Sequence, residues 1–445
     1  MSGSTAKYKP YPAYKPSGVE WLGGIPDHWA CVAVRRVARR VKTGGTPQGV
    51  SEEAFTQDGF PWYTPGDFGV GLFLDKSLRE LSPTGRGQVP VFPPDTVMMV
   101  GIGSLGKVGV TRVEAGCNQQ VNAIEVNRLM LPSFLARHLL GLGEYLLRCG
   151  KFTTLPIINQ DETRSLPVPL PPLPEQRAIA GFLDRETGRI DALIEKKRRL
   201  IELLVEKRSA LISHAVTKGL DPDAPMKDSG IDWLGQIPAH WEVKKLGFLS
   251  RIGNGSTPSR ENSLYWDDGD YPWLNSGVVN HSPVKAAEQF VTPLALHECH
   301  LPVVPPHSVL VGITGQGRTR GMSAVLTYEA TINQHVAYIT PHMDAATAAF
   351  LCWELTAAYP ILRDISDGAG STKGALTCEQ LGQFRLAVPP LPEQAHIAGQ
   401  LSSESAKLGA LVSKNREAID KLQEYRTALI SAAVTGKIDV REART

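Results

Sequence analysis

The sequence has no apolar run of about 18 residues, the length that a membrane-spanning helix needs. Its N-terminus carries lysine, tyrosine and proline in place of the apolar core of a secretory signal. The six cysteines are scattered without a C-x-x-C pair, as is typical of reduced thiols. His297, Cys299 and His300 lie close together but lack a second ligand pair at zinc-site spacing. We therefore expect a cytoplasmic protein with no membrane partner and no metal.

Neither sign of charge is in large excess, because 47 Lys and Arg residues stand against 45 Asp and Glu residues. A net charge of +2 excludes a polybasic nucleic-acid coat and an acidic tail protein. Any polyanionic partner must therefore be bound by local clusters of cations. Glycine (42 residues) and proline (33 residues) are frequent, which predicts many turns on a folded body.

Motifs of catalysis are missing as well. No Ser/His/Asp or Cys/His arrangement stands out, and the Asp/Asn-Pro-Pro-Tyr/Phe motif of adenine methyltransferases does not occur. Residues 101–106 match G-x-G-x-x-G, but Val108 stands where a phosphate loop needs Ser or Thr. Strands are expected on both sides of this turn, and the glycine spacing differs in the second half of the chain. We expect neither a catalytic site nor a cofactor in this chain.

The chain is a tandem duplication, in which three sequence blocks occur twice in the same order. The opening block is Trp-Leu-Gly…Ile-Pro…His-Trp, the second is Pro-Pro-Leu-Pro-Glu-Gln, and the third is Ala-Leu-Ile-Ser…Ala-Val-Thr. The first block recurs after 212 residues and the other two after 218. The pairs are 18–29 with 230–241, 171–181 with 389–399, and 209–217 with 427–435. A period this long predicts a whole domain with an appendage in each copy.

Each copy begins with mixed secondary structure and ends in a long helix. Short apolar runs broken by glycine predict strands at 97–102, 108–113 and 121–126, and at 308–313, 323–327 and 335–340. Helical stretches follow at 134–148 and 347–365. The proline-rich links 167–176 and 387–394 lead directly into long apolar-periodic runs. We interpret these links as helix starts rather than as recruitment motifs.

Both long helices carry a heptad pattern over about five heptads, which indicates that each packs against another helix along its length. The predicted seam is Ile179, Leu183, Ile190, Leu193, Leu200, Leu204 and Leu211 in the first copy, and Ile397, Leu401, Leu408, Leu411, Leu422 and Leu429 in the second. Two similar helices in one chain predict an intramolecular antiparallel coiled coil that fixes the spacing of the two domains. The basic run 195–199 is either a solvated face or a DNA contact.

The predicted fold is therefore α+β, with two tandem mixed α/β globular domains separated by two long antiparallel coiled-coil helices in a pseudo-two-fold repeat. We expect the first domain to span 1–170 and the first long helix 171–222. The second domain then spans 223–388 and the second long helix 389–445.

The three duplicated blocks resemble the specificity subunit of type I restriction–modification enzymes, and the resemblance covers essentially the whole chain. It implies that each half is a target recognition domain reading one half of a bipartite, asymmetric site in double-stranded DNA. It implies a non-catalytic subunit with two modification subunits, which methylate adenine, and two restriction subunits, which translocate and cleave DNA. S-adenosylmethionine, ATP and Mg would then be bound by those partner subunits and not by this chain.

Residues that differ between the halves are the better candidates for reading sequence, because the two domains are expected to read different bases. Two loops in each half supply polar or cationic side chains beside glycines, which allow close approach to DNA. Arg318 and Arg320 rank first, because arginine is the commonest bidentate reader of guanine. The candidates are Ser104, Lys107, Arg112, Lys151, Thr153 and Thr154 in the first half, and Gln316, Arg318, Arg320, Ser371, Thr372 and Lys373 in the second.

Some candidates are shared by both halves. Asn118-Gln119 and Asn333-Gln334 carry amides that can hydrogen-bond adenine edges. They occupy the same place in each copy, however, so we assign them to the structure of the domain. The turns 43–47 and 254–258 are further candidates, although a plain turn is the simpler interpretation. The sequence thus predicts a DNA-recognition subunit of a type I complex. The alternative is a stand-alone DNA-binding or architectural protein without methyltransferase partners.

Overall fold

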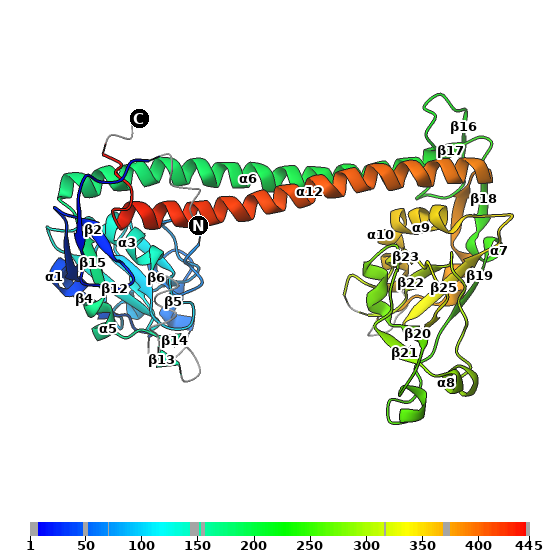
Figure 1. Ribbon diagram of the computed structural model, residues 1–445, viewed down its shortest axis with the longest axis horizontal. Coiled ribbons are helices and arrows are strands. Elements are labelled where there is room, and N and C mark those ends of the chain that lie inside the picture. Colours follow the sequence, from blue (N-terminus) through cyan, green and yellow to red (C-terminus); the bar gives the residue numbers. More distant parts are fainter. Residues whose placement is uncertain are drawn as a thin grey trace. The chain divides into compact units, whose positions relative to one another are not determined.

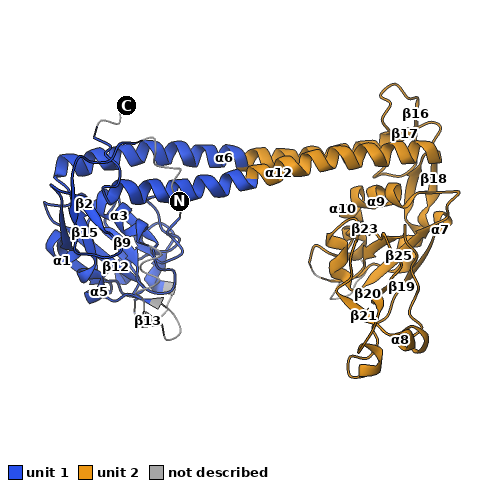
Figure 2. Ribbon diagram, viewed as in Figure 1, with its two compact units in different colours: residues 1–197, 416–445 blue, residues 198–415 orange. Residues whose placement is uncertain are grey.

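The computed structural model describes residues 8–47, 52–69, 71–142, 151–152, 156–315, 317–367 and 374–441, except for the side chains of 151, 152 and 156. Two compact units share these residues (Figure 2). Unit 1 combines residues 1–197 with 416–445, and unit 2 is the continuous segment 198–415. Unit 1 is therefore assembled from the two ends of the chain.

Unit 1 is built on a five-stranded sheet in the order β4-β12-β9-β10-β7 (Figure 1). Its pairs are antiparallel, except that β10 runs parallel to β7. A second sheet has the order β11-β6-β8-β5. The strands are β4 (Ala38–Thr43), β5 (Phe55–Thr56), β6 (Phe60–Tyr63), β7 (Phe73–Leu74), β8 (Glu80–Leu81), β9 (Val97–Val100), β10 (Val108–Thr111), β11 (Gly116–Cys117) and β12 (Val121–Val126). The three strands predicted in this half are confirmed.

Unit 2 repeats this plan with a four-stranded sheet in the order β19-β25-β22-β23 and a three-stranded sheet in the order β21-β20-β24. The strands are β19 (Ser250–Asn254), β20 (Tyr271–Leu274), β21 (Gln289–Val291), β22 (Val309–Gly312), β23 (Ser323–Val325), β24 (Thr331–Ile332) and β25 (Val336–Pro341). Central strands β9 and β22 are buried on both faces, which explains their continuous apolar runs. The strands predicted in this half are confirmed too.

Helices cover these sheets. The predicted helical stretches form α3 (Pro132–Gly141) in unit 1, and α9 (Ala348–Ala357) with α10 (Tyr359–Asp367) in unit 2. Shorter helices are α1 (Val34–Val37), α2 (Pro83–Arg86) and α5 (Gln160–Ser165) in unit 1, and α7 (Leu246–Leu249), α8 (Pro293–Glu298) and α11 (Cys378–Gln383) in unit 2. The side chains of Asn159 and Thr377 cap α5 and α11, each within a complete capping box.

The opening block forms a hairpin that packs on the start of a long helix in each unit. The hairpins are β1 (Tyr14–Pro16) with β2 (Gly24–Pro26), and β16 (Met226–Asp228) with β17 (Gln236–Pro238). The imidazole Nε2 of His28 lies 2.8 Å from Glu175 Oε2, and that of His240 lies 2.8 Å from Glu393 Oε2. Both glutamates stand in the first turn of a long helix. The first two repeated blocks thus recur together because they contact each other.

Long helices α6 (Leu173–Lys218) and α12 (Leu391–Val434) follow the strands β15 (Pro167–Leu170) and β26 (Arg385–Val388). These strands pair with β3 (Ala30–Ala33) and β18 (Glu242–Lys245), respectively. Gln176, which is fully buried, holds the start of α6 by bonds to the Pro171 and Leu129 carbonyls and the Leu131 amide. Gln394 makes the equivalent three bonds to Pro389, Ala345 and Thr347.

Within each unit, part of α6 packs antiparallel against part of α12. The first turn of α6 and the segment that follows α12 both contact the hairpin of unit 1. The contacts are His28–Glu175 and the Tyr14 hydroxyl, which donates to the Gly436 carbonyl at 3.0 Å. The end of α6 and the start of α12 contact the hairpin of unit 2 in the same way, through Lys218 and Glu393. The antiparallel helix pairing predicted from the heptads is confirmed inside each unit.

The predicted seam needs correction at three positions. Leu193, Leu200 and Leu411 are 44%, 43% and 47% exposed, whereas the other predicted seam residues are buried or half-buried. A heptad seam has two rows of residues, each repeating every seven positions. The structure places the second row one residue later than predicted, so that its residues lie four positions after those of the first row rather than three. That row contains the buried or half-buried residues Thr187, Ile194 and Ile201 in α6, and Ser405, Val412, Ile419 and Arg426 in α12. It continues in α6 to Arg208, which is exposed. A step of three residues and a step of four residues both fit the helical period. Only the position of the partner helix therefore decides which residues form the seam.

The two ends of the chain close unit 1. Lys437 Nζ donates to the carbonyls of Leu22 and Gly24 at 3.0 and 2.7 Å, and the Asp439 amide donates to the Lys9 carbonyl at 2.8 Å. In unit 2 the continuous chain makes the corresponding contact, since Lys218 Nζ donates to the Gln236 carbonyl at 3.2 Å. Among the described residues, no helix is long and apolar enough to cross a membrane.

Candidate nucleic-acid interface

The glycine turn between β9 and β10 presents two of the predicted contacts in unit 1. Gly103 and Gly106 have φ values of 80° and 87°, which only glycine adopts without strain. Ser104, which lies between these two glycines, and Lys107, which follows Gly106, are both exposed. Lys107 Nζ donates to the Pro65 carbonyl at 3.1 Å, so its ammonium is oriented yet still faces solvent. These side chains are placed where a polyanion could reach them.

Arg112, just after β10, is held in a defined orientation. Its guanidinium lies 4.4 Å from the centroid of the Phe73 ring, and its Nε lies 3.5 Å from Asp75 Oδ1. The side chain remains 58% exposed. A stacked and exposed arginine loses little conformational entropy on binding, which suits contact with a base or a phosphate.

In unit 2 the turn between β22 and β23 separates the two arginines that were ranked together. Arg318 is exposed, while its carbonyl accepts a hydrogen bond of 2.8 Å from the Tyr359 hydroxyl. Its neighbour Gly317 accepts a bond of 2.6 Å from Arg363. The main chain of the turn is therefore anchored to α10, while the side chain of Arg318 projects from it.

Arg320 lies in the interior instead. It is 3% exposed, and its guanidinium pairs with the carboxylate of Asp367. A Cβ atom on Gly374 would clash with the Arg320 guanidinium, so a side chain at 374 would displace that group from its present position. The burial of Arg320 does not favour the predicted contact with a guanine edge. Its place in the structure is that of a residue that supports the turn.

Described residues that flank the two candidate loops of each unit are joined by main-chain contacts. In unit 1 the Ile158 amide donates to the Gly101 carbonyl at 2.8 Å, and in unit 2 the Leu376 amide donates to the Ile313 carbonyl at 2.8 Å. β13 (Lys151–Phe152) pairs with β14 (Pro156–Ile157) beside this junction. Thr153, Thr154, Gln316, Ser371, Thr372 and Lys373 lie outside the described residues, as does the side chain of Lys151.

The shared Asn-Gln pairs divide into a buried and an exposed residue. Asn118 and Asn333 are 7% and 5% exposed, and the side-chain oxygen of each accepts the main-chain amide two residues later. Gln119 and Gln334 are exposed. The hydroxyl of Thr46 donates to the side-chain oxygen of Gln119, and that of Thr257 donates to the side-chain oxygen of Gln334. Both threonines stand in Thr-Pro turns. The asparagines thus shape the turns, and each glutamine joins two exposed turns.

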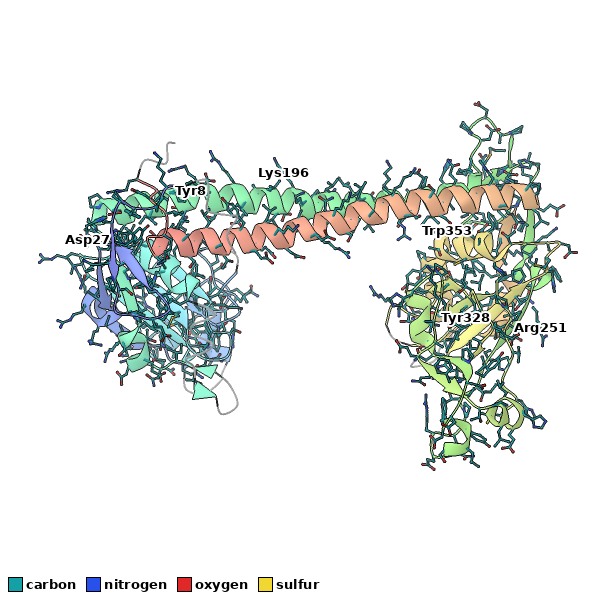
Figure 3. The ribbon with its side chains drawn as sticks, in the orientation of Figure 1. Tyr8, Asp27, Lys196, Arg251, Tyr328 and Trp353 are labelled. Atoms are coloured by element: carbon teal, nitrogen blue, oxygen red, sulfur yellow. The ribbon has the colours of Figure 1, made fainter. Side chains whose placement is uncertain are left out.

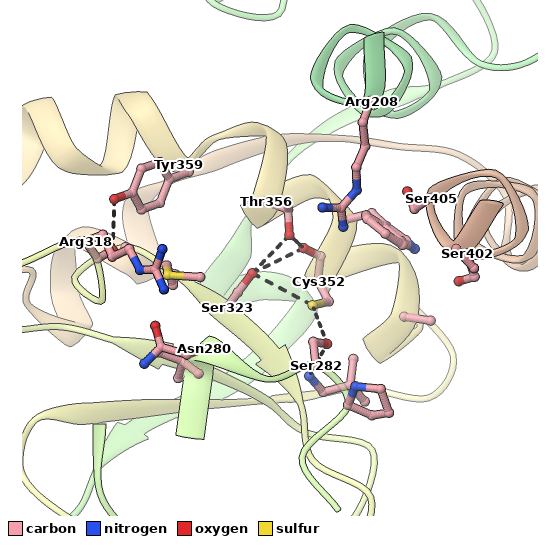
Figure 4. Close-up of a pocket in the computed structure, with 18 residues that line it drawn as sticks. Arg208, Asn280, Ser282, Arg318, Ser323, Cys352, Thr356, Tyr359, Ser402 and Ser405 are labelled. Carbon is pink, nitrogen blue, oxygen red and sulfur yellow. Dashed lines mark hydrogen bonds between the residues drawn. The ribbon is translucent and has the colours of Figure 1, made fainter. Parts of the chain in front are cut away.

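Two cationic residues of α6, Lys196 and Arg208, lie outside the candidate loops. Lys196, within the basic run 195–199, points away from α12 (Figure 3). Arg208, which is exposed and is not among the contacts predicted from the sequence, faces a cavity of about 1020 Å³ in unit 2 (Figure 4). Arg318 of the glycine turn lines the same cavity. The signal for Arg208 was present in the 218-residue repeat, which aligns it with Arg426.

Reactive chemistry is not favoured at the buried thiols. Burial raises the pKa of Cys117 to about 12 and also raises that of Cys352, so both remain protonated near neutral pH. Within the described ranges, no three His, Cys, Asp or Glu side chains are grouped so that they could hold a metal ion. In each unit the described part of the glycine turn is exposed and held by its neighbours, an arrangement suited to binding.

Comparison with known families shows where this arrangement recurs. A family model described as "Type I restriction modification DNA specificity domain" matches the chain twice, at residues 26–203 and 238–419. The MjaIX type I restriction enzyme specificity subunit of Methanocaldococcus jannaschii is 23% identical over 95% of this chain and 96% of its own length. The EcoR124I/EcoR124II specificity subunit of Escherichia coli is 22% identical over 54% of this chain and 55% of its own length.

Solved structures share the fold. A chain from a study of complex assembly and conformational transition of the type I R-M system has a TM-score of 0.74 and 18% identity, covering 93% of this chain and 99% of that chain. The HsdS subunit from Thermoanaerobacter tengcongensis has a TM-score of 0.55 and 18% identity, covering 93% and 98%. At this identity the likeness concerns the fold.

Proposed function

This chain belongs to the type I restriction modification DNA specificity family, and from this we propose that it reads a bipartite, asymmetric site in double-stranded DNA. One observation carries the proposal: two copies of one framework present different side chains on the same glycine turn. Ser104, Lys107 and Arg112 in unit 1 correspond in position to the turn that carries Arg318 in unit 2. Equal frameworks with unequal loops suit two different half-sites.

The subunit recognises DNA sequence and is not itself catalytic, as its family membership shows. Type I specificity subunits act in complexes with methylase and restriction subunits. We infer a complex with two modification and two restriction subunits, which use S-adenosylmethionine, ATP and Mg for adenine methylation, translocation and cleavage in the cytoplasm. The two domains are supported as two recognition modules by their separate cores.

Methylation mapping of cells that carry the complete system tests the bipartite site. We expect one methylated motif in two parts, separated by a non-specific spacer of fixed length. A continuous palindrome would contradict recognition by two different domains. Co-purification addresses the stand-alone alternative, since a recognition subunit should bring down a modification subunit encoded in its own genome.

Arg318→Ala tests base reading by the glycine turn of unit 2. We expect relaxed recognition of one half-site only, at a cost of roughly 1–3 kcal/mol if the guanidinium reads a base. Binding to duplexes with single-base changes in either half-site measures this directly. Lys107→Ala serves as the matched change on the other turn, and it should leave that same half-site unaffected. Equal loss at both half-sites would indicate a folding defect instead.

A further inference from the structure

The second seam row places one arginine at the same position in each unit. In unit 1, Arg426 forms a two-bond ion pair with Asp191: its Nε lies 2.9 Å from Oδ1 and its terminal nitrogen 3.3 Å from Oδ2. In unit 2 the corresponding arginine is Arg208, and the residue that corresponds to Asp191 is Gly409. The carboxylate that neutralises the first arginine therefore has no counterpart beside the second.

A second ion pair of unit 1 is also replaced. Arg137, the third residue after Phe134 in α3, is buried and pairs with Asp184 of α6. The third residue after Phe350 in α9 is Trp353, and the counterpart of Asp184 is Ser402. Unit 2 therefore has uncharged residues in place of both aspartates of this region. The arginine of the seam row is still present, as Arg208 of α6.

The space around Arg208 is open. Trp353, Ser402 and Ser405 line the cavity of about 1020 Å³ together with Arg208 and Arg318. Figure 4 shows the two arginines reaching into it from different elements, Arg208 from α6 and Arg318 from the glycine turn. Among the described residues that line it, none is acidic, and neither guanidinium has a hydrogen-bond or ion-pair partner.

A buried hydroxyl at this cavity also lacks a partner. Ser405 is 7% exposed, and its Oγ has no hydrogen-bond partner among the described residues. A buried polar atom without a partner is costly, and a bound acceptor would satisfy it. An unneutralised arginine and an unsatisfied hydroxyl on facing helices together select a ligand that is both anionic and rich in acceptor oxygens.

The position of Arg318 favours a phosphate over a carboxylate. It stands on the turn that is proposed to contact bases, so the cavity adjoins the DNA-facing surface of unit 2. A backbone phosphate reaches a protein wherever base-reading loops meet a duplex, and arginine binds its oxygens well. We propose that Arg208 and Ser405 bind a phosphate of the DNA backbone in this cavity, beside the half-site read by unit 2. This inference rests on the proposed DNA-recognition function.

Two variants of the full-length chain remove the site by different means. Arg208→Ala deletes the cation. Gly409→Asp restores in unit 2 the carboxylate that Asp191 supplies in unit 1, so it should neutralise Arg208 internally. A Cβ atom on Gly409 would meet no atom within 4 Å, so this variant should fold normally. Gly409→Asn is the matched control, because it has the same shape without the charge.

The measurement is the dependence of duplex affinity on salt, for the mapped site and for a scrambled duplex. A lost phosphate contact reduces the slope of log K against log salt by about 0.9. We expect Arg208→Ala and Gly409→Asp to lower the slope by that amount and to weaken affinity by about tenfold at low salt. Both duplexes should lose equally, because a phosphate carries no sequence information. Gly409→Asn should retain the wild-type slope.

Several outcomes would overturn the proposal. An unchanged salt slope in Arg208→Ala and Gly409→Asp would contradict the proposed phosphate contact. A change of slope in Gly409→Asn equal to that in Gly409→Asp would contradict it too. Unchanged DNA binding with weaker association to a modification subunit would identify a partner carboxylate as the occupant instead. If the wild-type chain does not discriminate the mapped site from the scrambled duplex, sequence recognition fails, while the Arg208 result is still decided by the salt slope on either duplex.

Discussion

Units 1 and 2 solve the same packing problem with different chemistry. Both place a hairpin on the start of a long helix, and both anchor that start with a buried glutamine, Gln176 or Gln394. Unit 1 uses the ion pair Arg137–Asp184 between α3 and α6, and the ion pair Arg426–Asp191 between α12 and α6. Unit 2 has Trp353, Ser402 and Gly409 at the corresponding positions. The framework is thus held by a few shared contacts, and the polar residues around it are free to differ.

The largest expected difference concerns the buried arginine of unit 1. Asp184→Ala should leave the guanidinium of Arg137, which is 4% exposed, without its carboxylate. Breaking a buried pair from one side costs about 3–5 kcal/mol, and we expect about 2 kcal/mol here because Asp184 is half-exposed. The free energy of unfolding in urea measures the loss.

Ser402→Ala is the matched change in unit 2. Its hydroxyl donates only to the Ala398 carbonyl of its own helix, at 2.7 Å, so the cost should stay within about 0.5 kcal/mol. Similar losses in both variants would mean that the ion pair adds nothing to the stability of unit 1.

The next difference is in the response to pH. Burial raises the pKa of Glu354 well above its usual value, and neither carboxylate oxygen has a partner among the described residues. The folded state therefore holds a proton that the unfolded state releases above about pH 4.5. Stability should fall as pH rises from there towards the folded pKa, by up to about 1.4 kcal/mol per pH unit. Glu354→Gln should remove this loss in melting experiments across pH.

His138 stands at the corresponding position of α3 and should respond in the opposite sense. Burial lowers its pKa to about 4, while its Nε2 lies 2.9 Å from the Pro167 carbonyl. Stability should therefore fall as pH drops from about 6.5 towards 4, because only the unfolded state takes up the proton. An acid-side loss that persists in His138→Gln would show that another group is responsible.

The smallest expected difference compares Asp191 with Gly409. Asp191→Ala removes a partly exposed ion pair and should cost about 0.5–1 kcal/mol. Gly409→Ala should instead stabilise the chain by about 0.5–1 kcal/mol, since alanine favours a helix interior and its Cβ meets no atom within 4 Å. Thermal unfolding of the two variants should shift in opposite directions. A shift in the same direction would mean that position 409 is under strain.

Much of the fold was predictable because the chain repeats itself. The repeated blocks, the central strands and the antiparallel helix pairing follow from periodicity and from the 218-residue offset. The second seam row was not predictable, because leucines at 193, 200 and 411 fit a three-residue step as well as isoleucine or valine at 194, 201 and 412 fits a four-residue step. Only the geometry of the partner helix separates the two.

The candidate site was predictable as a place and less so residue by residue. Residues that flank the two loops of each half are in contact, Gly101 with Ile158 and Ile313 with Leu376. Arg318 and Arg320 are two residues apart and look equal in the sequence, yet one is exposed and the other pairs with Asp367. Burial of Arg320 depends on Asp367 and Gly374, which are distant in sequence, so local pattern could not reveal it.

The discontinuity of unit 1 has a consequence for the order in which the protein matures on the ribosome. Unit 2 is a continuous segment whose last residue is 415, whereas unit 1 also needs residues 416–445. The contacts that Lys437 makes with the carbonyls of Leu22 and Gly24 in the first hairpin can therefore form only after unit 2 has been synthesised. The unit whose synthesis begins first is the last to be completed, which reverses the usual N-terminal-first order of domain folding.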